Sequence, residues 1–407
     1  MVRIAYVAPF FMPATVRFLS AVVELPGVVV GLISADPIDR LPAALRERLA
    51  AFQRISSPLS PVHIAEAILA MAPRLGHPDQ LVSTLEQLQV PLAQVRAVLG
   101  IPGMTEQAAI NFRDKSQMKD VLREAGLPVA RHRLVEGVDA GIRFFRESGG
   151  RLVIKPPAGA GAKGTFQVRS EREVSDVLRR LSPRPGRPVL CEEFIQGVER
   201  TLEVASLAGR PVWWSSTRYD PTPLHVLENP WIQWTITLPR EQDDPADAEV
   251  RRLGFAALRA LGMETGLSHM EWFRRADGTI AISEIGARPP GAQIVSLMSY
   301  AHDKDMFRAW ARMVVFGEFS PPIRRYAAGA AFLRGQGAGE RVRSVHGLDA
   351  AQRALGHLVV ESSLPNRGQG RSSSYEGEGY VIIRHHRTAV VERALRRLIS
   401  TVQIATY

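Results

Sequence analysis

Residues Leu152–Val168 read LVIKPPAGAGAKGTFQV, with β-favouring residues at both ends and a glycine-rich middle. The apolar run that opens this stretch predicts a short buried strand ending at Lys155. Three glycines follow, at which backbone N–H groups can come close to a ligand: Gly159, Gly161 and Gly164. Consecutive N–H groups in such a turn form a concave site for anions. The stretch predicts a β-hairpin whose tip folds over a polyphosphate, and an ordinary glycine hairpin is the alternative.

The distribution of lysine supports phosphate binding. Of the 51 Lys plus Arg residues only five are lysines: Lys115, Lys119, Lys155, Lys163 and Lys304. Four of these five lie between positions 115 and 163. In a chain that uses arginine for most of its positive charges, a lysine indicates a site that needs a compact point charge. The alternative is that the four lysines lie in this range by chance.

Composition narrows the class of protein. With 407 residues the chain can form two or three domains, and 45% hydrophobic with 23% charged residues are typical of a soluble globular protein. The net charge of +10 is spread along the chain and interleaved with acidic residues. No nucleic-acid reading module accompanies it, so we predict no nucleic-acid partner. No apolar run reaches the length of a membrane span, and we predict no membrane partner.

The single cysteine, Cys191, excludes an intrachain disulfide and favours a reducing, cytoplasmic location. The N-terminus, MVRIAYVAPFFMPA, faintly resembles a signal peptide. Pro9, Pro13 and the alternation of strand and helix patterns that follows favour a first strand instead. Over residues 1–105 this alternation predicts a parallel α/β sheet, Rossmann-like but without the GxGxxG fingerprint of dinucleotide binding.

Two glutamates mark a second cluster. The segments His269–Arg274 (HMEWFR) and Thr279–Glu284 (TIAISE) predict two strands joined by a turn that contains Asp-Gly. Such a hairpin brings Glu271 and Glu284 close together, and two carboxylates beside a polyphosphate favour Mg²⁺. Arg288 follows four residues later and can clamp a carboxylate or phosphoryl oxygen. The alternative is two surface glutamates on opposite edges of the hairpin.

Residues 219–234 contain three prolines and two tryptophans and predict an irregular segment, either a lid or aromatic packing at a domain edge. This segment also carries three side chains that could bind an amine group, with no ranking among them: Asp220, His225 and Glu228.

Five motifs in order resemble the ATP-grasp superfamily of ADP-forming carboxylate–amine ligases. They are DKSQMKDVLREAGLP, VIKPPAGAGAKG, CEEFIQGVE, HMEWF and SEIGARPPG. The HxE strand and the ExxxR spacing are most similar to the dipeptide-forming L-amino-acid ligases. The resemblance implies a mixed α/β and α+β ATP-grasp fold with an N-terminal Rossmann-like, pre-ATP-grasp domain.

The resemblance implies the following domains. The pre-ATP-grasp domain spans 1–105 and the ATP-grasp domain 106–320, with a nucleotide lobe at about 115–195 and a catalytic lobe at about 196–320. Residues 321–407 complete the catalytic lobe.

The resemblance also implies a role for each matching residue. ATP is held by Lys115 and Lys155, by the loop 159–164 with Gly159, Gly161 and Gly164, by a hinge of Glu192, Glu193, Phe194 and Ile195, and by Glu199 at the ribose. Glu271 and Glu284 hold one or two Mg²⁺ ions, with Mn²⁺ as a substitute. The catalytic candidates are Arg288, Lys163 and His269; for His269, a hydrogen-bonded structural role is the alternative. Gly286 stands where many members have asparagine, which leaves the number of metal ions open.

These roles imply an ATP-dependent ligase that joins a small carboxylate and a small amine through an acyl phosphate, and a homodimer is compatible with the family. Two alternatives remain: a bicarbonate-activating carboxylase-type enzyme, and a non-catalytic ATP-binding regulatory relative.

Overall fold

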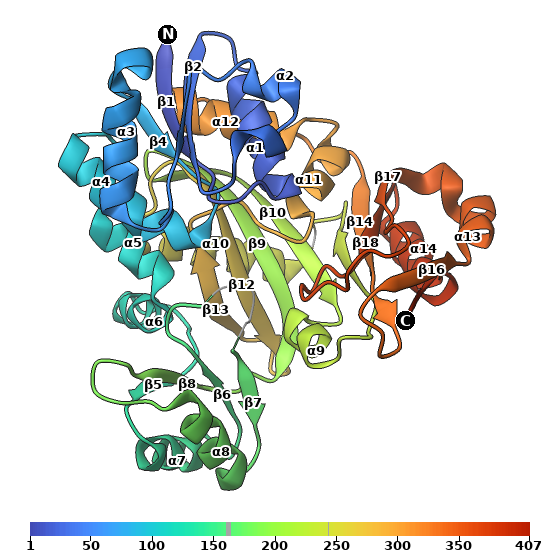
Figure 1. Cartoon of the computed structure of the whole chain (residues 1–407). Helices are drawn as coiled ribbons and strands as arrows, with labels where there is room; N and C mark the ends of the chain where they lie inside the picture. The colour runs from blue at the N-terminus through green and yellow to red at the C-terminus, as the bar shows by residue number, and fades with distance from the viewer. Residues whose placement is uncertain (160–163, 243) are drawn as a thin grey trace.

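The computed structural model describes residues 1–159, 164–242 and 244–407, and in these ranges the strands form four β-sheets. An eight-stranded antiparallel sheet is the centre of the molecule, and the three smaller sheets surround it (Figure 1). The mixed α/β and α+β architecture expected from the sequence is therefore confirmed. Among the described residues, no helix is both long and apolar enough to cross a membrane.

The N-terminal sheet is parallel, with strand order β3-β2-β1-β4. Its strands are β1 (Val2–Val7), β2 (Val28–Ser34), β3 (Ala51–Arg54) and β4 (Gln80–Val82). The helices that follow these strands in the chain are α1 (Pro13–Val23), η1 (Ile38–Arg40), α2 (Ala43–Arg46), α3 (Pro61–Leu75), η2 (Glu86–Leu88) and α4 (Gln89–Leu99). Successive strand residues face opposite sides: Ile4 and Tyr6 pack with α1, and Ala5 and Val7 pack with α3 and α4.

A four-stranded antiparallel sheet of order β5-β8-β6-β7 forms the lower lobe in Figure 1, and helices α7 and α8 cover it. Two helices lead into this lobe, α5 (Glu106–Arg113) and α6 (Lys115–Glu124). The lobe consists of β5 (His132–Val135), α7 (Val138–Glu147), β6 (Leu152–Lys155), β7 (Phe166–Val168), α8 (Glu171–Leu181) and β8 (Val189–Glu193). The predicted hairpin exists, because β6 pairs antiparallel with β7.

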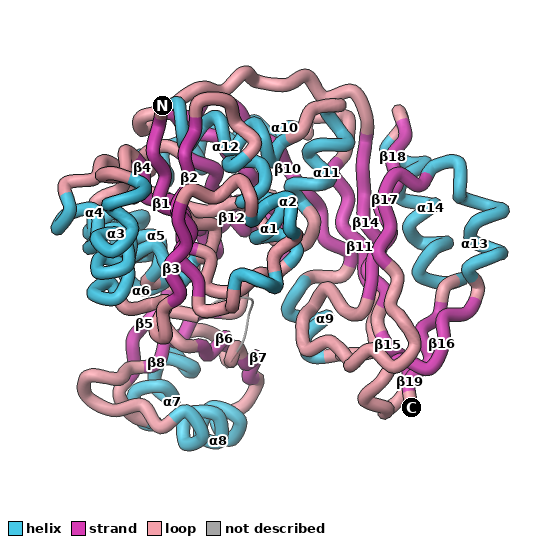
Figure 2. The backbone as a smooth tube through the Cα atoms, turned by 45° about the horizontal axis from the view of Figure 1, so that its top comes forward, coloured by secondary structure: helices cyan, strands magenta, loops and turns pink. Residues whose placement is uncertain are grey.

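The central sheet has the strand order β13-β12-β9-β10-β11-β14-β18-β17. Its strands are β9 (Gly197–Leu207), β10 (Arg210–Asp220), β11 (Trp234–Leu238), β12 (Gly266–Arg275), β13 (Ile280–Gly286), β14 (Ala327–Leu333), β17 (Val359–Ser363) and β18 (Gly379–His385). The helices of this region are α9 (Pro223–Glu228), α10 (Pro245–Leu261), α11 (Ile294–His302) and α12 (Met306–Phe316). The last three strands come from the C-terminal part of the chain, beside α13 and α14 (Figure 2).

The chain ends in a small sheet of order β15-β19-β16. Its strands are β15 (Gly335–Gln336), β16 (Val342–His346) and β19 (Gln403–Thr406). The helices of this part of the chain are α13 (Leu348–Leu355), η3 (Gly356–Leu358) and α14 (Thr388–Thr401). Helix α14 packs its apolar face on β14 and β18 through Val391 and Leu395, which are fully buried. This packing attaches the C-terminal segment to the central sheet.

The expectation that residues 219–234 are irregular is only partly right. Strand β10 continues to Asp220, and the six-residue helix α9 follows with Pro223 in its first turn. Proline fits the first turn of a helix, where its missing N–H has no partner anyway, so the prolines that suggested a loop are compatible with this helix.

His302 in α11 is buried as a neutral imidazole. Its Nδ1 donates to the carbonyl of Met298 at 2.7 Å, and burial together with the charge of Arg324 lowers its pKa from 6.5 to about 4. The unfolded chain takes up this proton below pH 6.5, whereas the folded chain does so only near pH 4. We expect the free energy of unfolding to fall by roughly 3 kcal/mol over this range because of His302. Urea denaturation at several pH values should show a smaller fall for His302→Gln, and exposed His357→Gln is the control.

Candidate active site

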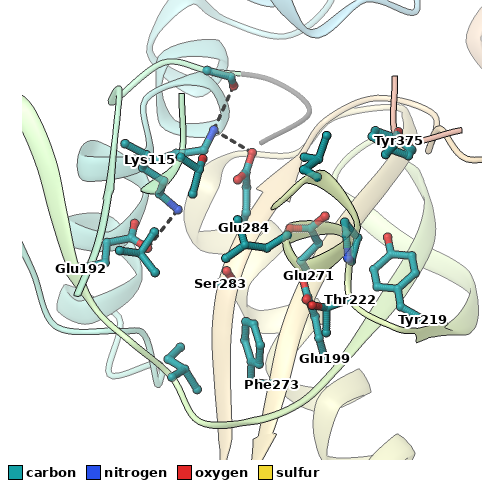
Figure 3. A pocket seen from close by; sticks show the side chains of 18 of the residues that line it. Lys115, Glu192, Glu199, Tyr219, Thr222, Glu271, Phe273, Ser283, Glu284 and Tyr375 are labelled. Atoms are coloured by element: carbon teal, nitrogen blue, oxygen red, sulfur yellow. Dashed lines mark hydrogen bonds and ion pairs between the residues drawn. The ribbon is translucent and has the colours of Figure 1, made fainter. Parts of the chain in front are cut away.

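A cavity of about 440 Å³ lies between the four-stranded lobe and the central sheet. Both sheets and the connection between them supply its lining. The lobe contributes Val153, Lys155, Glu192 and Glu193, and the central sheet contributes Glu199, Tyr219, Trp234, His269, Glu271, Phe273, Ser283 and Glu284. Figure 3 shows this cavity with Lys115 above Glu284 and with Glu271 at its middle. Charged residues far apart in sequence therefore share one enclosed space.

Helix α6 places Lys115 at the cavity and holds the fully buried Lys119 one turn further along. The carboxylate of Asp114 caps the helix by accepting the N–H groups of Ser116 and Gln117 at 2.8 and 2.9 Å. This cap puts Lys115 in the first turn and Lys119 one turn later on the same face. Lys115 Nζ lies 2.8 Å from Glu284 Oε1 and donates to the carbonyl of Gly159 at 3.0 Å.

Glu192 on β8 joins two buried lysines. Its carboxylate lies 2.9 Å from Lys155 Nζ and 3.3 Å from Lys119 Nζ, and Lys119 also donates to the carbonyl of Ser283. Burial opposes ionisation of Glu192, but the two lysine charges outweigh it and hold its pKa below the ordinary value. Burial lowers the pKa of Lys119; for Lys155 burial is opposed by Glu192 and Glu284, which raise its pKa. Lys119 is one of the four lysines between positions 115 and 163, but no individual role was predicted for it.

The Glu192 carboxylate should therefore be essential to stability. We expect Glu192→Gln to lower the free energy of unfolding by about 3 kcal/mol at neutral pH, because it leaves buried ammonium groups without their counter-charge. Urea denaturation measures this loss, with Glu124→Gln, an exposed glutamate of α6, as the control. A loss no larger than that of the control would show that the lysines do not depend on Glu192.

Glu271 and Glu284 are direct partners in the antiparallel register of β12 and β13, as the predicted hairpin requires. Their side chains are 30% and 24% exposed, and both line the cavity. Burial opposes ionisation of Glu284, but Lys115 and Lys155 lower its pKa to about 2, so it is charged at neutral pH. Burial and the nearby Glu271 raise the pKa of Glu199 well above its ordinary value. Three carboxyl groups therefore lie on this wall of the cavity, and the raised pKa of Glu199 lowers the negative charge that they carry together.

His269 is held between two carboxylates. Its Nδ1 lies 3.0 Å from Glu203 Oε1, and its Nε2 lies 3.8 Å from Glu271 Oε1. Burial disfavours its charged form, but both glutamates outweigh burial and raise the pKa of His269 to about 9. An imidazolium at neutral pH has no free lone pair to accept a proton. The structure therefore favours the hydrogen-bonded alternative over a general base.

Arg288 contacts a residue that the sequence reasoning missed. Its Nε lies 3.1 Å from Glu86 Oε2, and the other oxygen of Glu86 lies 3.0 Å from Arg113 Nη1. Arg113 in turn donates to the carbonyls of Ala158 and Gly159 at the start of the glycine loop. Glu86 belongs to η2 of the N-terminal domain and is 5% exposed. No motif surrounds it in the sequence, so only the tertiary structure reveals this bridge.

The connection between the lobes is fixed by hydrogen bonds. The N–H groups of Glu193 and Phe194 donate to the carbonyls of Arg131 and Arg151, so these two hinge donors are already used inside the protein. The Glu193 carboxylate accepts from Arg131 and Arg275, while Ile195 is nearly buried. The predicted binding of adenine by this backbone can therefore use only hinge groups other than these two N–H donors.

Some predicted residues are placed elsewhere or not described. Gly161 and Lys163 lie outside the described residues, whereas Gly164 is described and has φ +73°, a conformation that suits glycine. Asp220, His225 and Glu228 are exposed and do not line the cavity. The neighbours that face the cavity are Thr222, Pro223, Leu224 and Leu227.

Comparisons with known proteins agree with this geometry. Residues 120–301 match the ATP-grasp domain family. The chain is 26% identical over 226 residues to the L-arginine-specific L-amino acid ligase of Bacillus subtilis, covering 54% of each chain. It is 24% identical over 276 residues to the alanine–anticapsin ligase of Bacillus subtilis (strain 168), covering 63% of this chain and 57% of that one. The chain thus spans little more than half the length of these relatives.

The crystal structure of an L-amino acid ligase from Bacillus licheniformis has the same fold, with a TM-score of 0.80 at 17% identity over 100% of this chain and 99% of that one. The chain therefore contains an ATP-grasp domain and has the ATP-grasp fold. Its predicted resemblance to the L-amino acid ligases is confirmed.

Proposed function

We propose that this protein is an ATP-dependent carboxylate–amine ligase, which joins a small acid to a small amine and releases ADP and phosphate. The observation that carries the proposal is the convergence of Lys115, Lys155, Glu271, Glu284 and Arg288 on one cavity. They come from α6, β6, β12, β13 and the segment after β13. A regulatory ATP-binding protein needs the lysines, but it has no need of two carboxylates and an arginine beside them.

The lysines and the apolar surfaces fit a nucleotide between the two sheets. Val153, Ile195 and Phe273 line the part of the cavity at the hinge, where an adenine ring would find apolar partners. Lys155 and Lys115 lie further in and would contact the phosphates. Glu199 lies below Glu271 in Figure 3 and would reach the ribose hydroxyls.

The carboxylates Glu271 and Glu284 fit a hard divalent cation such as Mg²⁺. Among the described residues no cluster of three or more His, Cys, Asp and Glu side chains forms a metal site. Two carboxylates completed by phosphate oxygens and water suit Mg²⁺, which seldom uses an all-protein cage. When bound, Mg²⁺ would neutralise charge on the phosphate chain. The number of ions stays a prediction.

In the proposed reaction, a carboxylate oxygen of the acid attacks the γ-phosphorus of ATP, and the bond to the β-phosphate oxygen breaks to release ADP. The amine then attacks the acyl carbon, loses a proton and displaces phosphate. Lys115, Lys155 and Arg288 offset the negative charge of the transferring phosphoryl group, a reaction that depends mainly on positioning and electrostatics. Closure of the loop 159–164 against water stays a prediction.

A screen of acid–amine pairs with ATP and Mg²⁺ tests the proposal. We expect an amide product by mass spectrometry together with an equal amount of ADP. ADP release that depends on bicarbonate and gives no amide would support a carboxylase-type enzyme instead. Tight ATP binding without ADP release under any condition would support a regulatory protein.

A further inference from the structure

The cavity has an end that lies away from the lysine cluster. In Figure 3, Tyr219, Thr222 and Tyr375 are on the opposite side of Glu271 from Glu192. The residues that line this end are Tyr219, Thr222, Tyr375 and Trp234, whose ring lies against both tyrosines. None of these described residues carries a charge. Glu271 and Arg288, which line the same cavity, belong to the proposed reaction centre, and Glu376 follows Tyr375 directly in the chain.

Three aromatic rings from separate elements form the wall of this end. The ring centroids of Tyr219 and Trp234 are 6.0 Å apart, and those of Trp234 and Tyr375 are 5.8 Å apart in an edge-to-face arrangement. Trp234 is fixed from both sides, because it stacks on Phe332 at 4.5 Å and its Nε1 donates to the carbonyl of Tyr375 at 2.7 Å. The wall is therefore preformed.

Tyr375 and Glu376 come from the turn 374–378, which precedes β18 and lies outside the ATP-grasp domain match. The Tyr375 hydroxyl would lie 2.9 Å from a Cβ at Gly291, so any larger residue at 291 would displace it. The Glu376 carboxylate accepts the N–H of Ala292 at 3.3 Å and the side-chain amide of Gln293 at 3.2 Å.

The contact with Glu376 has a conformational role. Ala292 and Gln293 have φ of +50° and +58°, a left-handed conformation that residues with a side chain seldom adopt. Such residues persist only when their surroundings hold them. Glu376 holds both, and in this way fixes the start of α11 and the position of Ile294 in the cavity.

From this geometry, and resting on the proposed ligase function, we propose that the turn 374–378 completes a substrate subsite for an apolar or aromatic side chain. Tyr375 is the specificity-determining residue, because its ring closes the wall built by Tyr219 and Trp234. Glu376 is a positioning residue, because it acts through Ala292 and Gln293. The amino and carboxyl groups of the same substrate then point to Glu271 and Arg288.

Direct binding tests the subsite without turnover. Calorimetry in the presence of Mg²⁺ and a non-hydrolysable ATP analogue should show that L-phenylalanine and L-leucine bind at least tenfold more tightly than L-aspartate and L-lysine. Tyr375→Ala should weaken L-phenylalanine about tenfold, the effect of losing aromatic contacts. It should leave the affinity for the ATP analogue within about twofold, since Tyr375 lies away from the lysine cluster. Tyr375→Phe should keep the binding of L-phenylalanine, and the exposed Tyr407→Ala is the matched control.

If Glu376 is a positioning residue, its substitution should change KM for one substrate and not for the other. Glu376→Ala should raise KM for the apolar substrate with KM for ATP unchanged, and Glu376→Gln, which keeps one acceptor oxygen, should recover part of the loss.

Two results would overturn the proposal. One is equal affinity for charged and apolar amino acids, and the other is an equal loss of affinity for the nucleotide and for the amino acid in Tyr375→Ala. An absence of ADP release with every acid–amine pair would refute the ligase function alone, because the relative affinities of the amino acids are measured without turnover.

Discussion

Glu284→Ala is expected to reduce ADP formation by about 10³-fold or more, since a metal ion supplies several kcal/mol of charge stabilisation in the transition state. The carboxylate of Glu284 is ionised at neutral pH and lies beside both Glu271 and Lys115, so its loss removes a proposed metal ligand and also frees a lysine. Coupled-enzyme assays of ADP release at saturating ATP measure this effect.

The experiment needs a control for folding. The Glu284→Ala variant should keep a cooperative urea transition. The control Glu340→Ala, at an exposed glutamate in a different part of the sequence from Glu284, should retain full activity. If a high Mg²⁺ or Mn²⁺ concentration restored part of the turnover of Glu284→Ala, the metal assignment would gain support. Near-normal turnover at ordinary Mg²⁺ would show that Glu284 holds no catalytic ion.

Arg288→Ala is expected to reduce kcat by about 10³-fold while KM for ATP stays within about threefold, as for an arginine that stabilises the transferring phosphoryl group. Glu86 holds the guanidinium at 3.1 Å, so the charge is already oriented before any substrate binds. Arg288→Lys should recover little, because an ammonium group cannot reproduce the planar fork of a guanidinium.

Steady-state kinetics with varied ATP separates the two parameters, and Arg172→Ala, at an arginine whose side chain is 92% exposed, is the control. If Arg288→Ala changed only KM for ATP, Arg288 would belong to nucleotide binding and the proposed role would be wrong. The nucleotide affinity of the variant, measured by calorimetry, decides between these two outcomes.

Local patterns predicted the hairpins and the residues that they carry. Strand alternation with an Asp-Gly turn placed Glu271 opposite Glu284, and the apolar run before Lys155 placed that lysine at the end of a buried strand. These contacts lie within hairpins, where the register follows from the turn and the side-chain period of two. Sequence reasoning is strongest for such local geometry.

Contacts between distant segments could not be predicted in this way. Glu86 and Arg288 are about 200 positions apart, and Lys119 reaches Glu192 only because α6 packs beside the four-stranded sheet. Tyr375 lies beyond every recognised motif and reaches the cavity through the turn before β18. Helix α9 was missed because its prolines are equally typical of a loop.

The bridge that Glu86 forms has a consequence for protein engineering. One carboxylate from the N-terminal domain holds both Arg288 and the arginine that contacts the base of the glycine loop, Arg113. An exchange of segments at the predicted domain boundary near residue 105 would therefore affect the contacts of both arginines. A chimera that receives this domain from a relative would keep its two arginines oriented only if the donor also supplies an acidic side chain at the position of Glu86.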